Sequence, residues 1–208
     1  MTGQTSPQRT DTSNMTVLTQ RFDDALVFAR QRHQTQTRKG TAIPYIAHLL
    51  STAALVLEAG GDEDQAIAGL LHDTLEDREY TEVTYQELTK RFGKRVAGIV
   101  RDCSDAEPEP GAEKESWRTR KERYVAGLHH HSLDSLLVSC ADKLHNARAI
   151  LADYRIHREG LWSRFNPDSD QLWYYRSLVN AYRGAGTPLA AELDRVVTEL
   201  EGLVTAAR

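Results

Sequence analysis

The chain has 208 residues, 40% hydrophobic and 27% charged, which is enough for one domain with a single well-filled core. Its net charge of −4 and isoelectric point near 6.1 argue against a nucleic-acid-binding protein, because such proteins usually carry a basic domain. No apolar run approaches the ~18 residues of a membrane span, and the N-terminus has no hydrophobic signal segment. We therefore expect a cytoplasmic protein with no membrane partner.

Residues 1–18 are rich in Thr, Ser, Gln and Pro and offer little to bury, so we expect a disordered tail followed by one domain over residues 19–208. From Arg21 onward, apolar residues recur at spacings of three and four, which predicts helices. The expected helices cover residues 21–33, 45–58, 62–77, 84–93, 94–103, 117–128, 133–154, 168–183 and 188–204. No stretch alternates as a strand would. The sequence therefore predicts an all-α fold, a single bundle of about eight helices.

Three of these helices carry recognisable start signals. Asp62 with Gln65 resembles a capping box, and Thr84 with Glu87 has the same spacing. Thr187 before Pro188 predicts an N-cap followed by proline at the first helical position. We expect residues 105–111 to form a polar loop, because their prolines prevent regular secondary structure.

The run from His72 to Asp77 follows an almost wholly apolar stretch, which is typical of a buried helix. At about 100° per residue, the side chains of one face less than half the helix circumference wide are His72, Asp73, Glu76 and Asp77. Carboxylates crowded around an imidazole repel one another unless a cation joins them, so a divalent metal is the economical explanation. The alternative for this run alone is an exposed polar face at a helix end.

Two further segments place polar side chains in apolar sequence. His48 follows Pro44 at the start of an apolar helix, and Asp142 lies deep in another, on the same face as Asn146. A core aspartate needs a cation or several donors, and Lys143 or Arg148 are local candidates. Taken jointly, two histidines and two aspartates form a ligand set that suits Mn²⁺, Fe²⁺ or Zn²⁺.

These segments resemble the HD-domain metal-dependent phosphohydrolases, in particular the hydrolase domains of Rel/SpoT-type alarmone enzymes and the stand-alone small alarmone hydrolases. The matching motifs are Pro44-Tyr45-Ile46-Ala47-His48 behind Arg38-Lys39, then Leu70 to Asp77, then Ala141 to Asn146. The resemblance covers residues 21–183 and implies an HD-type hydrolase domain over residues 19–208.

By this resemblance, one metal ion, expected to be Mn²⁺, is bound by His48, His72, Asp73 and Asp142. Glu76 and Asp77 would position or deprotonate the attacking water, and Glu76 is near enough to act as a general base. The implied reaction is removal of the 3′-diphosphate of (p)ppGpp or (p)ppApp as pyrophosphate. His145 is expected beside the ligands as a supporting residue.

The resemblance also implies a substrate, a purine nucleotide bearing a 3′-diphosphate. Arg38 and Lys39 match a base-stacking and phosphate-contacting pair, although the loop between them and His48 differs in length from that of relatives. Asn146 matches a ribose-contacting position. With one divalent ion bound, the four acidic residues leave about two negative charges, so an anionic nucleotide needs basic side chains nearby.

Several other features have an ordinary structural interpretation. We expect residues 118–123 to form a solvated basic helix face, 173–175 to pack in the core and 129–131 to lie on the surface. Cys103 and Cys140 form no close-spaced pair and are expected to be buried free thiols.

Two other functions remain open from the sequence. One is an HD hydrolase of another nucleotide, such as an adenine-based alarmone or a deoxynucleotide. The other is a non-catalytic module that binds alarmone or acts as an antitoxin. Glu76 and Asp77 argue against the second, because a binding-only module needs no water-activating group.

Overall fold

The computed structural model describes residues 16–76, 83–104 and 115–207. Over these ranges the chain is all-helical, with nine α-helices, two short 3-10 helices and no strand beyond an isolated bridge between Thr37 and Pro44. This confirms the predicted fold class. No helix in the same ranges is long and apolar enough to cross a membrane.

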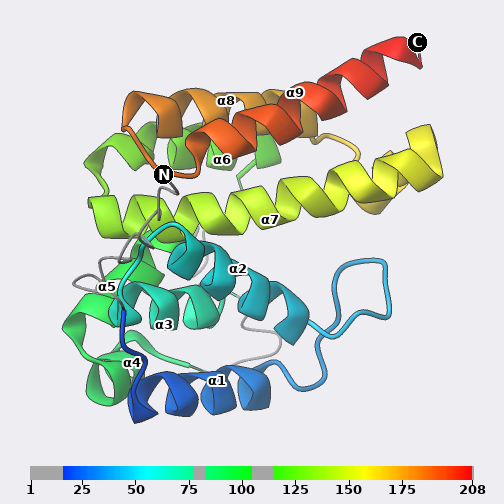
Figure 1. Cartoon of the computed structure of the whole chain (residues 1–208). Coiled ribbons are helices and arrows are strands. Elements are labelled where there is room, and N and C mark those ends of the chain that lie inside the picture. The colour runs from blue at the N-terminus through cyan, green and yellow to red at the C-terminus, as the bar shows by residue number, and fades with distance from the viewer. Residues whose placement is uncertain (1–15, 77–82, 105–114, 208) are drawn as a thin grey trace, which may run out of the picture.

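The helices form two groups on either side of α7 (Figure 1). The first group is α1 (Gln20–Arg32), α2 (Ile46–Glu58), α3 (Glu63–Leu71), α4 (Tyr85–Phe92) and α5 (Lys94–Cys103). The second is α6 (Trp117–Gly127), α8 (Gln171–Gly184) and α9 (Ala190–Ala206). The long helix α7 (Leu133–His157) is preceded by η1 (Leu128–His130) and followed by η2 (Arg158–Arg164).

Two helices each contain a segment that is buried on every side. All residues from Ala66 to Leu71 in α3 are buried, as are all residues from Ser135 to Asp142 in α7. Gly69 lets α3 approach α2 closely, since a Cβ at this position would lie 3.1 Å from Ala53 Cα. Polar groups that follow or interrupt these segments are therefore held in the core.

Helix starts are partly as predicted. Asp62 and Gln65 form the capping box of α3, and Thr84 caps α4. The predicted cap at Thr187 is wrong, because α9 begins only at Ala190 after a turn that contains Pro188. Both cysteines are buried and free.

The predicted tail lies largely outside the described residues, as does the predicted loop of 105–111. The part that is described, Thr16–Leu18, lies against the start of α3, where Thr16 Oγ1 donates to the carbonyl oxygen of Gly61 at 2.9 Å.

Candidate metal and nucleotide site

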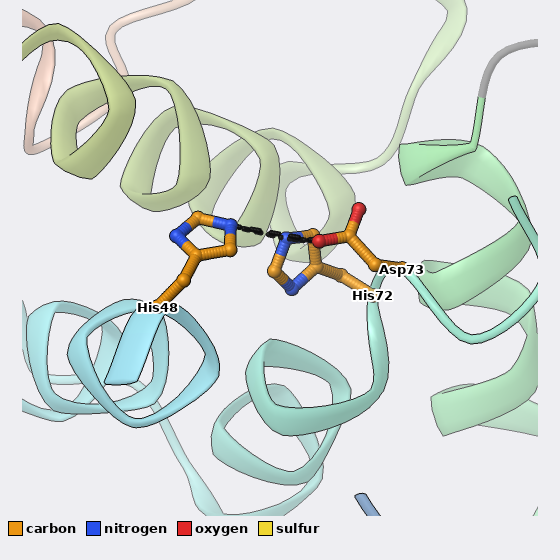
Figure 2. Close-up of side chains that lie close together, drawn as sticks. All are labelled: His48, His72 and Asp73. Atoms are coloured by element: carbon orange, nitrogen blue, oxygen red, sulfur yellow. Dashed lines mark hydrogen bonds and ion pairs between the residues drawn. The ribbon is translucent and has the colours of Figure 1, made fainter. Parts of the chain in front are cut away.

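Four predicted ligands meet where α2, the end of α3 and the middle of α7 converge. His48 Nε2 lies 3.2 Å from His72 Nε2 and 3.5 Å from Asp73 Oδ2, and these three side chains point toward one another (Figure 2). His72 Nε2 lies 2.9 Å from Asp73 Oδ2. Asp142 Oδ1 lies 3.2 Å from His48 Nε2 and 3.6 Å from His72 Nε2. We call these four residues the ligand cluster.

The prediction of helix to Asp77 is wrong, because α3 ends at Leu71. His72 directs Nδ1 to the carbonyl oxygen of Gly69, and Thr74 directs both its backbone nitrogen and its hydroxyl to the carbonyl oxygen of Leu71. A side chain that bonds nearby carbonyls in this way competes with the helix. The chain therefore turns at His72, and this turn, rather than a shared helix face, brings Asp73 to the cluster.

Hydrogen bonds on the outer side of each ring orient the histidines. The Gly69 carbonyl can only accept, so His72 Nδ1 carries the proton and contacts it at 2.9 Å. His48 Nδ1 lies 2.7 Å from His145 Nδ1. Burial together with the nearby His48 and Arg38 lowers the pKa of His145 to about 4, so His145 is neutral near pH 7 and can accept. In neutral rings these contacts direct both Nε2 lone pairs into the cluster.

The electrostatics of the cluster favour a cation. Burial lowers the pKa of His72, but the carboxylates of Asp73 and Asp142 outweigh burial and raise it well above the usual value. Burial raises the pKa of both carboxylates, but other contacts outweigh it. The charge of His72 and hydrogen bonds from both histidines hold the pKa of Asp73 well below its usual range. The charge of Lys143, followed by contacts with the same histidines, does so for Asp142. The cluster thus draws positive charge to the ring nitrogens. The ligand atoms of His48, His72 and Asp73 all lie within 4.8 Å of one another, a grouping that a divalent metal ion fits. Asp142 Oδ1, close to both ring nitrogens, adds a second carboxylate beside it.

The two carboxylates also have outer partners. The Tyr45 hydroxyl donates to Asp73 Oδ2 at 2.6 Å, and Lys143 Nζ donates to Asp142 Oδ2 at 2.7 Å. The lysine therefore occupies the oxygen that faces away from the histidines and leaves Asp142 Oδ1 in the cluster. Arg148, the other predicted partner of Asp142, pairs with Glu192 instead.

Comparison with known proteins fits this geometry. The family model described as HD domain matches residues 25–162, which is more than half of the chain. The chain belongs to the HD domain family.

Two relatives and one solved structure show where this HD domain lies within the family. It is 34% identical to the guanosine-3′,5′-bis(diphosphate) 3′-pyrophosphohydrolase MESH1 of Xenopus tropicalis over 83% of this chain and 90% of the relative. It is 29% identical to the MESH1 of Drosophila melanogaster over 85% of this chain and 92% of the relative. The solved structure of a metazoan ortholog of SpoT that hydrolyzes ppGpp superposes with a TM-score of 0.71 at 27% identity, covering 90% of this chain and 99% of the other.

A cavity of about 690 Å³ adjoins the ligand cluster of this HD domain. Tyr45 and Asn146 line it and also contact cluster carboxylates, since the Asn146 amide donates to Asp142 Oδ1 at 2.5 Å. Arg38 donates to Asn146 Oδ1 at 2.7 Å, and Lys39 lines the same cavity. The structure thus brings the three predicted substrate contacts together beside the metal ligands.

The two predicted catalytic residues are less well placed by the structure. Glu76 lies exposed on the turn after Asp73, and its backbone nitrogen donates to the Asp73 carbonyl oxygen at 3.2 Å. Asp77 lies outside the described residues. Their roles therefore remain predictions.

The ordinary interpretations of the remaining features are mostly upheld. Of the predicted core residues 173–175, Tyr174 and Tyr175 are buried and Trp173 is partly buried against the core, but Tyr175 also lines the cavity. His129 and His130 are exposed, whereas His131 is only half-buried. In the basic helix face, Arg118 and Arg123 are exposed, and Arg118 lies over the Trp173 ring.

Three residues that line the cavity were not predicted from the sequence: Tyr45, Asp153 and Arg164. Tyr45 could have been found from its place inside the motif that ends at His48. No sequence signal marks Asp153 or Arg164.

Proposed function

We propose that this HD domain is a metal-dependent phosphohydrolase that removes the 3′-diphosphate of (p)ppGpp or (p)ppApp. The observation that carries the proposal is a buried cluster of two histidines and two aspartates that adjoins a large cavity lined by Arg38 and Lys39. The names of the MESH1 relatives, which are guanosine-3′,5′-bis(diphosphate) 3′-pyrophosphohydrolases, support the same reaction.

In this proposal His48, His72, Asp73 and Asp142 hold one divalent ion, and Mn²⁺ is our first choice among metals that imidazole and carboxylate ligands suit. Such an ion, when bound, lowers the pKa of a bound water and polarises a phosphoryl oxygen. The chain's own contribution is to fix the ligands. Gly69 and His145 hold the rings, and Tyr45 and Lys143 hold the carboxylates.

We assign proton transfer to Glu76, with Asp77 beside it in sequence. The water oxygen bonds to the phosphorus attached to the 3′ oxygen, and Glu76 accepts the water proton. The bond between that phosphorus and the 3′ oxygen breaks, the 3′ oxygen takes a proton from solvent, and Glu76 returns its proton to solvent. The products are a 3′-hydroxyl nucleotide and pyrophosphate. Glu76 suits this role because it is exposed and lies three residues after the ligand Asp73.

Substrate binding falls to the cavity. Arg38 and Lys39 supply positive charge for phosphates, while Asn146 is placed to contact the ribose, because it lies between Arg38 and Asp142. The Arg38 guanidinium also lies 6.0 Å from the centre of the Tyr45 ring, and Tyr45 contacts the ligand Asp73, so Arg38 is held near the ligand cluster. In a nucleotide with its 3′ end at the metal, the phosphates would thus contact Arg38 and Lys39, and the ribose would contact Asn146.

The direct test incubates purified protein with Mn²⁺ and, separately, ppGpp, ppApp and dGTP, and identifies the products by chromatography. We expect pyrophosphate from ppGpp or ppApp and none from dGTP. Release of tripolyphosphate from dGTP would indicate a deoxynucleotide hydrolase, and tight binding of alarmone without turnover would indicate a binding module.

The E76Q variant tests the assigned base. We expect turnover to fall by about 10²–10⁴-fold, because Gln cannot accept the proton, while Mn²⁺ binding measured by calorimetry stays unchanged. Full activity of E76Q would remove Glu76 from the mechanism.

A further inference from the structure

An ion pair between Asp153 and Arg164 lines the same cavity as the predicted substrate contacts. Asp153 lies on α7 and Arg164 ends η2, and Arg164 Nη1 lies 3.0 Å from Asp153 Oδ2. Both side chains are partly exposed, at 37% for Asp153 and 25% for Arg164, so a ligand in the cavity can reach them. Within the described ranges no donor contacts Asp153 Oδ1.

The pair is held by a third element. Gly40 has φ of +72°, and a Cβ there would lie 3.2 Å from Arg164 Cδ, so the Arg164 stem packs directly on the loop that carries Arg38 and Lys39. Contact with that loop and with α7 restricts Arg164, which in turn fixes one oxygen of Asp153. The carboxylate is therefore preorganised, with its second oxygen available.

The position of the pair suits the base of a nucleotide. Along α7, Asp142 is in the ligand cluster, Asn146 follows one turn later, and Asp153 follows two turns after that, about 10 Å beyond Asn146. This separation is comparable to the length of a purine nucleoside. Ala149, Ile150 and Leu161 line the cavity with apolar surface for a flat ring.

From this geometry we propose that Asp153, positioned by Arg164, reads the nucleobase and makes this site prefer guanine over adenine. The inference rests on the proposed function. Guanine presents two adjacent N–H donors, at N1 and the 2-amino group, to a carboxylate that can only accept. Adenine presents a ring nitrogen lone pair next to its amino group, which a carboxylate repels. Arg164 offsets the charge of Asp153, so the carboxylate does not repel the phosphates.

The test compares kcat/KM for ppGpp, its inosine analogue and ppApp. Because the inosine analogue keeps N1–H but lacks the 2-amino group, we expect it to fall between the other two. In D153A we expect kcat/KM for ppGpp to drop by about 10–100-fold, mainly through KM, while ppApp changes less than about 3-fold. An equal loss for all three substrates, or a preference of the unmodified protein for ppApp, overturns the proposal.

Two further variants serve as controls. D134A removes another aspartate of α7 that pairs with an arginine, since Asp134 Oδ2 lies 2.8 Å from Arg95 Nε, and it should leave base preference unchanged. R164M should weaken the preference while keeping part of it, because Asp153 remains but is no longer held. A shift of base preference in D134A equal to that in D153A would overturn the assignment.

Equilibrium binding separates this inference from the proposed reaction. GDP and ADP are titrated against the unmodified protein and D153A by calorimetry, which needs no turnover. Tighter GDP binding that D153A abolishes supports base reading even if no alarmone is hydrolysed. Equal affinity for GDP and ADP, or failure to bind either, overturns base reading whatever the outcome of the hydrolysis assay.

Discussion

At the scale of single residues, His145 shows how a side chain beside the ligand cluster controls it. Its Nδ1 lies 2.7 Å from His48 Nδ1, and its pKa of about 4 keeps it neutral above that pH. A neutral acceptor at this position holds the proton of His48 on Nδ1, which leaves Nε2 for a metal. The arrangement stabilises one tautomer without adding charge to the cluster.

We therefore expect H145A to weaken Mn²⁺ binding by about 10–100-fold, the usual loss when an outer partner of a ligating histidine is removed. Calorimetric titration of the metal-free protein measures this directly. H129A is the matched control, because His129 is exposed and lies on η1, an element that carries none of the ligands. Unchanged affinity in H145A would show that the His48 ring is oriented by its packing alone.

The ligands were predictable from single residues, because burying an unpaired polar side chain in an apolar segment costs free energy. Asp142 interrupts an apolar helix and His72 follows another, so both needed partners. Asp153 carries no such signal, because a partly exposed acid on a helix is ordinary. Its place beside Arg164 depends on how η2 folds back along α7, which no local pattern encodes.

At the scale of elements, the close approach of α3 to α2 depends on one missing side chain. A Cβ on Gly69 would lie 3.1 Å from Ala53 Cα and 3.3 Å from Ala53 N, and neither backbone atom can move independently. The same contact places His72, three residues on, opposite His48.

G69A should therefore destabilise the fold by about 1–3 kcal/mol, the usual cost of overpacking a core. G98A in α5 is the matched control, because no described atom lies within 4 Å of the added Cβ, and it should stabilise by about 0.5–1 kcal/mol. Urea unfolding followed by circular dichroism measures both. Equal stability of the two variants would mean that α2 and α3 can separate freely.

The start of α3 gives a pH-dependent prediction. Burial raises the pKa of Asp62, but hydrogen bonds from the Gln65 backbone and Arg95 outweigh burial and lower it below its usual 3.8. Because the folded-state pKa is the lower one, this stabilisation is present above pH 3.8 and is lost as pH falls through the lowered value. This pH-dependent stabilisation adds to the stabilisation that Asp62 provides as the N-cap of α3.

D62A should cost about 1 kcal/mol at pH 7, as expected for loss of an N-cap. It should also flatten the fall in stability with pH near and below 4, since the titrating group is gone. Thermal melts from pH 3 to 7 measure both effects, with T84A as a capping variant that has no charge to lose. A D62A curve parallel to the unmodified one would contradict the assigned pKa shift.

Helix existence was predictable from periodicity, but some helix ends were not. Leu75 keeps the apolar spacing one turn beyond Leu71, yet the chain turns there because His72 and Thr74 bond preceding carbonyls. Pro188 looked like a first helical residue, but α9 starts after it, at Ala190. In both places, alternative hydrogen bonds or turns compete with the helix at similar local cost.

At the scale of the whole molecule, the ligand cluster joins elements that are distant in sequence. His48 comes from α2, His72 and Asp73 follow α3, and Asp142 comes from α7. A bound ion therefore links the first group of helices to the helix that lies between both groups (Figure 1).

We expect Mn²⁺ at 100 times its Kd to stabilise the fold by about 2.7 kcal/mol. For a chain of this length that corresponds to a rise in Tm of about 5–10 °C. Differential scanning fluorimetry with Mn²⁺ or with chelator measures it. H72A should lose the shift and E76Q should keep it. A shift that survives in H72A would place the metal elsewhere.

The straight course of α7 has an evolutionary consequence. One continuous helix carries Asp142, Asn146 and Asp153. The rise of that helix therefore sets the distance between the metal end of the site and the residue proposed to contact the base. A lineage can replace Asp153 and acquire a new nucleotide preference without disturbing the metal ligands. Related enzymes that differ in substrate would then differ at this position first, while their chemistry stays the same.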